Sequence, residues 1–217
     1  MERRRRRPRS RRGVIGELLL LVVVVVLATS MVRSFLVAPF SIPSGSMEQT
    51  LHVGDRILVD RLSYRFHDVR RGDIVVFDGT EAFGHLGDGN GETDYVKRVI
   101  GLPGDHVMSL GTDDHGDGKV YVNGKPLAES KYLYPGEVAS KTPFDKVVPP
   151  GHLWLMGDHR ADSLDSRAHT GEPGGGMVPI DKVLGRVMLV VWPLDRLGRV
   201  PDSGLPDAPT GAAAGHR

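Results

Sequence analysis

The chain has 217 residues, enough for one sizeable domain with attachments, and it contains no cysteine. The absence of cysteine excludes thiol chemistry, cysteine-ligated zinc and disulfide bonds. The formal net charge is only +1, but it is segregated: residues 1–12 carry +7, which leaves −6 on the other 205 residues. The 28 glycines and 15 prolines favour loop-rich β structure over a helical bundle.

A basic tail, residues 1–12, precedes an apolar stretch. Residues 14–32 are apolar at all but four positions, and eleven consecutive apolar residues run from Leu18 to Ala28. Nineteen helical residues span about 28 Å, close to the ~30 Å hydrocarbon core of a bilayer. Because arginines precede this stretch, we predict one transmembrane anchor at residues 13–33, with the N-terminus cytoplasmic and the remainder extracytoplasmic.

A cleaved signal peptide is the alternative, because its apolar region has about 7 to 15 residues. The uncleaved anchor is favoured by two features of the sequence. Residues 31–34, Met-Val-Arg-Ser, offer no small-x-small cleavage site, and apolar residues resume at Phe35. A basic tail could also bind nucleic acid, but the apolar stretch directly after it indicates a membrane instead.

Short β-like segments follow the anchor. Asn123-Gly124 is the strongest hairpin signal among them, and the interior Arg186 identifies the last one as a strand rather than a second span. Flexible connections are expected at residues 79–92, 111–118 and 171–176, and a disordered tail at 201–217. The predicted strands are residues 56–60, 73–77, 95–101, 119–127, 152–158 and 183–194. Residues 34–200 therefore read as a mostly antiparallel β domain.

No metal or cofactor site is expected from the sequence. Residues 113–118, Asp-Asp-His-Gly-Asp-Gly, partly fit a calcium loop, but His115 and Gly124 occupy two of its ligand positions. A Ser-His-Asp hydrolase would need a GxSxG elbow, which the chain lacks. His159 and His169 stay open as bases, although no motif supports them.

Ser46 is the first candidate for chemistry. It lies in Phe-Ser-Ile-Pro-Ser-Gly-Ser-Met-Glu-Gln-Thr-Leu, residues 40–51, where Pro43 and Gly45 shape a turn that could expose a hydroxyl and bring backbone N–H groups near a carbonyl. Most such serines only close turns. A following strand would hold the hydroxyl on a rigid element, which favours a catalytic role.

Lys97 and a polar segment, residues 157–167, are the other candidates. Lys97 interrupts an apolar strand; facing inward it would be desolvated, which lowers a lysine pKa and favours the neutral amine that can activate a serine. Facing outward it would be an ordinary surface lysine. The polar segment, Gly-Asp-His-Arg-Ala-Asp-Ser-Leu-Asp-Ser-Arg, reads as a hydrogen-bonded network in which Ser163 could contact a buried amine and Asp165 could pair with Arg167.

Together these three motifs resemble the bacterial type I signal peptidases, membrane-bound enzymes that remove signal peptides from exported proteins, and the resemblance extends from the anchor to about Pro193. It implies an antiparallel β catalytic domain with a smaller inserted β lobe at about residues 105–150. It also implies a serine endopeptidase that acts at the outer face of the cytoplasmic membrane. The substrates implied are preproteins with small-x-small cleavage sites, and the other contact is membrane phospholipid rather than nucleic acid.

The resemblance also assigns roles to individual residues. It implies that Ser46 is the nucleophile, that Lys97 is the general base, and that Ser44 contributes to the oxyanion hole together with Ser46. It further implies that Ser163 orients the lysine, supported by Asp165 and Arg167.

Two positions depart from the family pattern: Gln49 stands where proline is usual, and His159 where asparagine is usual. Neither removes a reacting group. The apolar residues between the anchor and the turn (Phe35, Leu36, Val37, Phe40 and Ile42) predict an apolar surface that touches lipid, with a first core strand as the alternative.

The sequence allows two alternative interpretations. Self-cleaving repressors share the chemistry but need a DNA-binding domain, which the N-terminus leaves no room for. An anchored β domain that only binds a partner would need neither Ser46 nor Lys97.

Overall fold

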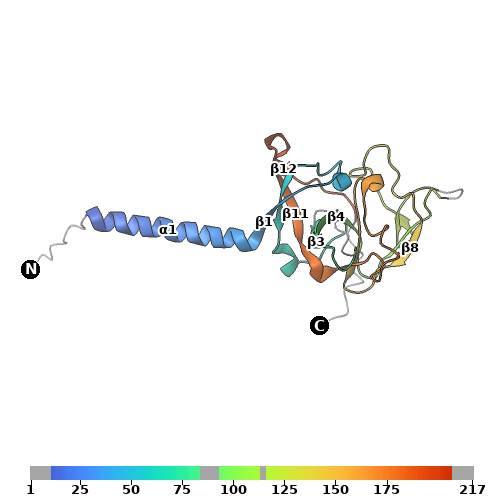
Figure 1. The fold of residues 1–217 in the computed structure, drawn as a ribbon, viewed down its shortest axis with the longest axis horizontal. Coiled ribbons are helices and arrows are strands. Elements are labelled where there is room, and N and C mark those ends of the chain that lie inside the picture. The colour runs from blue at the N-terminus through green and yellow to red at the C-terminus, as the bar shows by residue number, and fades with distance from the viewer. Residues whose placement is uncertain (1–10, 84–92, 113–115, 207–217) are drawn as a thin grey trace, which may run out of the picture.

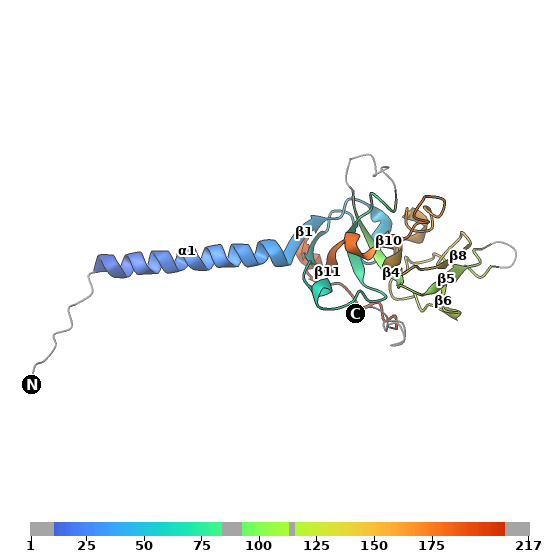
Figure 2. The same ribbon diagram turned by 90° about the horizontal axis from the view of Figure 1, so that it is seen from below.

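The computed structural model describes residues 11–83, 93–112 and 116–206 (Figure 1). Helix α1 (Arg11–Leu36) extends away from a β domain in both perpendicular views (Figures 1 and 2). The large apolar side chains of its central part, Ile15 and residues 18–27, are 51–65% exposed. Among the described residues, however, no helix has the length and apolarity that crossing a membrane requires. The predicted transmembrane helix at residues 13–33 is therefore not supported by this structure.

The larger sheet has the strand order β1-β2-β11-β3-β4-β9-β10, with β12 paired to β11. All of its pairs are antiparallel. Strand β3 is buried from Ile74 to Phe77, which explains its unbroken apolar run. The strands are β1 (Val37–Ser41), β2 (Arg56–Asp60), β3 (Ile74–Asp78), β4 (Asp94–Gly101), β9 (His152–Met156), β10 (Val178–Pro179), β11 (Val183–Trp192) and β12 (Gly198–Arg199).

A smaller antiparallel sheet, ordered β7-β6-β5-β8, lies at the end of the domain far from α1 (Figure 2). Its strands are β5 (His106–Ser109), β6 (Tyr121–Val122), β7 (Lys125–Pro126) and β8 (Phe144–Val147). They fall within residues 105–150, where the inserted lobe was expected. Asn123 and Gly124 both have positive φ, 51° and 75°, as a two-residue hairpin of this type requires.

The six predicted strands all contain strands of the structure, with small shifts at their ends. Strands β5, β8, β10 and β12 were not predicted, and β1 was predicted only as an alternative. Residues 37–41 form the first strand, which was the alternative to a purely lipid-contacting segment. Strand β8 has the sequence Phe-Asp-Lys-Val, and its two central charged residues lie outside the core. Four residues are too few to show the alternation of apolar and polar residues by which a strand is recognised.

Short 3-10 helices connect the strands: η1 (Gly45–Met47), η2 (Ser63–Arg65), η3 (Arg160–Asp162), η4 (Ile180–Lys182) and η5 (Leu194–Arg196). The predicted disordered tail needs one correction, because Ser203 and Leu205 are buried. Ser203 packs directly against Gly72, and a β-carbon on residue 72 would clash with the Ser203 side chain. The rest of the predicted tail, residues 207–217, lies outside the described residues, as do residues 1–10, 84–92 and 113–115.

Candidate active site

Ser46 and Lys97 meet although 51 residues separate them. Ser46 lies in η1, directly after the turn at Pro43, and Lys97 lies in β4. The Lys97 amine Nζ donates to the Ser46 hydroxyl Oγ across 2.7 Å. Lys97 is 4% exposed and Ser46 is 6% exposed, so the Lys97 side chain faces inward. Water has little access to this hydrogen bond, and a buried amine is destabilised in its charged form.

Ser44 is the residue before η1 and has an extended backbone, with φ −127° and ψ 159°. This conformation turns its hydroxyl back toward Ser46, and the two Oγ atoms are 3.5 Å apart. The same turn explains one departure from the family pattern. Gln49 has a φ of +84°, a left-handed value that a proline ring, fixed near −65°, could not adopt.

Asp165 is the centre of the third predicted motif. Arg167 donates to both of its carboxylate oxygens at 2.8 Å, from Nε and Nη2. The Ser163 hydroxyl and the Gly157 N–H donate to Oδ2 at 2.7 and 3.0 Å. Burial alone would raise the pKa of the Asp165 carboxyl, but the Arg167 guanidinium and these hydrogen bonds outweigh it and hold that pKa below its usual range.

We predict that Asp165→Asn lowers the free energy of unfolding by about 3 kcal/mol at neutral pH, because it leaves a buried guanidinium without its counter-charge. A carboxyl whose pKa is depressed by folding stabilises the protein above its unfolded pKa, and this contribution is lost as the pH falls below that value. Urea unfolding of the full chain in detergent, at neutral pH and near pH 3, measures both effects. Asp162→Asn, an exposed change in η3, is the control. Equal stability of the two variants at neutral pH would contradict the prediction.

Gly157 brings the polar segment against the nucleophile. A β-carbon at this position would lie 2.5 Å from the Ser46 carbonyl oxygen and 2.3 Å from the Ser163 hydroxyl. These distances are far shorter than van der Waals contact. Only glycine therefore permits Ser163 to approach the backbone of Ser46 at this point.

Gly157→Ala is expected to lower kcat about 100-fold, since displacement of a reacting group by about 1 Å has an effect of that size. Gly171→Ala is a matched control, because a β-carbon there would have no neighbour within 4 Å. Cleavage rates of both variants test the idea. Activity of Gly157→Ala equal to that of the control would show that the approach of Ser163 to Ser46 is dispensable.

A second buried network lies behind Lys97 and was not predicted. Arg98 is 1% exposed and donates to both oxygens of Asp158 at 2.7 Å, from Nε and Nη2. Its third nitrogen donates to the Gly72 carbonyl at 2.8 Å, and the ring of Tyr132 lies 4.2 Å from its guanidinium. The residue next to Lys97 in β4 is thus held in place by a buried ion pair. The charged Arg98 within an apolar strand was the signal for it.

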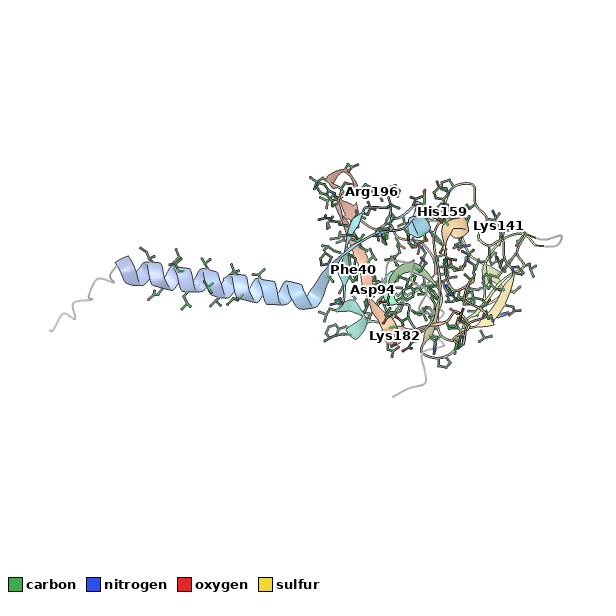
Figure 3. The ribbon with its side chains drawn as sticks, viewed as in Figure 1. Phe40, Asp94, Lys141, His159, Lys182 and Arg196 are labelled. Atoms are coloured by element: carbon green, nitrogen blue, oxygen red, sulfur yellow. The ribbon has the colours of Figure 1, made fainter. Side chains whose placement is uncertain are left out.

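A cleft of about 480 Å³ adjoins Ser46 and Lys97. One wall is formed by residues 39–44 at the end of β1, and the other by residues 93–97 at the start of β4. Phe40 lines the cleft from one wall and Asp94 from the other; both are labelled in Figure 3. Strand β1 is the outermost strand of the larger sheet, so this cleft runs along a sheet edge.

The histidines do not form a metal site in the described part of the chain, where no group of three or more His, Asp or Glu residues could hold an ion. Three residues of the rejected calcium loop, 113–115, lie outside that part. His169 stacks on Phe83 with ring centroids 4.4 Å apart. Its burial is the main cause of a lowered pKa.

Comparison with known proteins agrees with these motifs. The family model "Signal peptidase, peptidase S26" matches residues 15–192. A probable signal peptidase I of Mycobacterium leprae is 36% identical, over 77% of this chain and 72% of that protein. Signal peptidase I of Mycobacterium tuberculosis is 38% identical, over 77% and 69%. A probable signal peptidase I-2 of Synechocystis is 39% identical, over 79% and 70%.

Similarity to a solved structure is weaker. A crystal structure of a signal peptidase I from Enterococcus faecalis aligns with a TM-score of 0.39 and 25% identity, over 55% of this chain and 97% of that one. The assignment therefore rests on the sequence matches, which span most of this chain and of its relatives. The chain belongs to the S26 family of signal peptidases, and it is a type I signal peptidase, a serine peptidase that removes signal peptides from preproteins.

Proposed function

We propose that this signal peptidase cleaves preproteins with a Ser46–Lys97 dyad. The observation that carries the proposal is the 2.7 Å hydrogen bond between Lys97 Nζ and Ser46 Oγ, made by two buried side chains. A serine hydroxyl is a weak nucleophile until an adjacent base accepts its proton. Neutral Lys97 has the position and the burial that such a base needs.

In the first half of the reaction, Ser46 Oγ attacks the scissile carbonyl while its proton passes to Lys97. The resulting oxyanion is stabilised by the Ser44 hydroxyl and the Ser46 N–H. Collapse of this intermediate breaks the C–N bond, and protonated Lys97 gives its proton to the leaving amine of the mature protein. The signal peptide remains on Ser46 as an ester.

In the second half, a water attacks the ester and gives a proton to Lys97. The signal peptide leaves with a new carboxyl end, and Ser46 recovers its hydroxyl proton. Ser163 would hold the amine during both proton transfers. Asp165 and Arg167 would in turn hold Ser163, whose hydroxyl donates to Asp165 at 2.7 Å.

The substrate would lie as an extended strand in the cleft along β1. Strand β1 pairs with β2 on one side only, and residues 39–42 at its end line the cleft. Addition of a peptide to a sheet edge supplies main-chain hydrogen bonds, while pockets select alternate side chains. Buried Ile42 and Met47 line the cleft next to Ser46 and leave little depth there. Small residues at the small-x-small positions fit this arrangement.

The test of this function is cleavage of a purified preprotein by the full chain in detergent, followed by N-terminal sequencing of the product. We expect one cut after a small-x-small site, and loss of cutting when either small residue is replaced by leucine. Replacement of the intervening residue by leucine is the control and should be tolerated. Efficient cleavage after leucine or phenylalanine would contradict the proposed substrate.

The second part of the proposal is that α1 attaches the domain to the membrane, with the basic tail in the cytoplasm. The exposed apolar side chains of residues 18–27 would be unfavourable in water, because each buried CH₂ group gains about 0.8 kcal/mol. Helix α1 leads directly into β1, whose end lines the cleft. Enzyme and membrane-tethered preprotein would thus be confined to the same membrane surface. This confinement raises the effective concentration of the scissile bond at the active site.

Orientation is testable because the natural chain has no cysteine. Ser10→Cys marks the tail, and Lys125→Cys marks the exposed end of the smaller sheet. In intact spheroplasts, a membrane-impermeant maleimide should label the second variant only, while lysed cells should show both labelled. Labelling of Ser10→Cys before lysis, or recovery of the unlabelled chain without membranes, would contradict the proposed attachment.

A further inference from the structure

His159, which is labelled in Figure 3, lies between Glu48, directly after the turn of the nucleophile, and Glu137, in the connection between β7 and β8. Its backbone N–H donates to the carbonyl oxygen of Ser46 at 3.1 Å. Its ring is stacked on Tyr134, with centroids 4.0 Å apart and an angle of 8° between the planes. The residue is therefore tied to the nucleophile by its backbone and oriented by its ring.

Each ring nitrogen of His159 faces a carboxylate. Nδ1 lies 3.6 Å from Glu48 Oε2, and Nε2 lies 3.4 Å from Glu137 Oε1. Glu48 directly follows η1, and its N–H is bonded to the Gly45 carbonyl. Glu137 is held from the other side, because its second oxygen accepts the N–H of Ala161.

A neutral imidazole cannot satisfy this arrangement. It carries one N–H, so the lone pair of its other nitrogen must face a negative oxygen. Among the described residues Nδ1 has no hydrogen-bond partner, although it is buried. The imidazolium has two N–H donors and would attract both carboxylates, and the face of Tyr134 favours a cation.

We infer that His159 is a positioning residue for Ser46, and that its protonated ring bridges Glu48 and Glu137 and fixes the nucleophile turn. The inference rests on the proposed role of Ser46. Besides these two carboxylates, the neighbouring charged residues are Asp158 and Arg160, on either side of His159, and Asp162, whose backbone N–H donates to the His159 carbonyl. Asp158 pairs with Arg98, and Arg160 pairs with Glu129. When the ring loses its proton, one bridge contact becomes repulsive and the turn loosens.

The asparagine that is usual at this position has no charge and could serve only as an uncharged donor. The bridge thus adds a pH response that the usual residue lacks. Gain or loss of a proton on the ring would make or break the bridge, so the effect of His159 on kcat should depend on pH. Lys97 must be neutral in the same enzyme, so the two groups act on opposite sides of the pH profile.

The experiment compares kcat of wild type and His159→Asn from about pH 5.5 to pH 8.5, at saturating preprotein. We expect wild type to be about fivefold faster at the acid end, the size of one partly exposed charge-assisted contact, and equal to the variant at the alkaline end. His152→Asn, whose ring bonds only the Pro150 carbonyl among the described contacts, is the control and should give a constant ratio.

A double-mutant cycle with Glu48→Gln identifies the partner. Its coupling with His159→Asn should be present at the acid end and vanish at the alkaline end. If His159→Asn fails to fold, Glu48→Gln and Glu137→Gln replace it and should show the same pH-dependent loss. A ratio independent of pH, with Ser46→Ala inactive throughout, would overturn the bridge alone. Retained activity of Ser46→Ala would instead overturn the proposed function on which it rests.

Discussion

Replacement of either Ser46 or Lys97 by alanine should lower kcat by at least about 10⁴-fold, because each removes one half of the nucleophile–base pair. Of the side-chain contacts that the described residues make with Ser46 Oγ, the one with Lys97 Nζ at 2.7 Å is the contact with a basic group. Double replacement should be no worse than either single one, because the two residues act as a unit. Single-turnover cleavage of a preprotein measures all three rates.

Controls for this prediction come from residues of the same types outside the site. Ser63→Ala in η2 and Lys119→Ala, an exposed lysine, should keep normal rates. Wild type should also lose activity as the pH falls, since a protonated lysine cannot accept the serine proton. Near-normal cleavage by Lys97→Ala would contradict the role of Lys97 as the base for Ser46.

Ser44→Ala should lower kcat about 10²- to 10³-fold while leaving KM nearly unchanged, as expected for loss of one oxyanion donor. Its hydroxyl lies 3.5 Å from Ser46 Oγ in the resting enzyme. A short rotation would direct it to a developing oxyanion. Because the negative charge exists only in the transition state, substrate binding should not suffer.

Ser41→Ala is the matched control for Ser44, since Ser41 lines the same cleft from the end of β1. Ser41→Ala should leave kcat unchanged and alter KM at most. A Ser44→Ala enzyme with normal kcat and a raised KM would show that Ser44 shapes the cleft and does not stabilise the oxyanion.

Much of the fold could be predicted from residue patterns. The apolar runs at residues 56–60 and 73–77 and the Asn123-Gly124 hairpin gave strands close to those of the structure, because burial and turn conformation are local properties. The short strands β5 and β8 were missed. They pair with each other across more than 30 residues, and four residues carry too little alternation to reveal that pairing.

For the site, the sequence indicated which residues matter but not how they meet. The inward orientation of Lys97 depends on where β4 packs, which no local pattern determines. The ion pair of Arg98 with Asp158 was missed for the same reason, since its members are 60 residues apart. The sequence marked His159 as a departure, but the two carboxylates that face its ring come from distant segments.

Trapping the covalent intermediate tests directly whether Ser46 is the nucleophile. Full-length enzyme is mixed with a slowly deacylating ester of a small-x-small peptide, quenched in acid, digested and analysed by mass spectrometry. We expect one acyl group on Ser46 of the wild-type enzyme, and almost none on the Lys97→Ala variant. Acylation of Ser44 or of any other residue in the turning-over enzyme, with Ser46 unmodified, would contradict it.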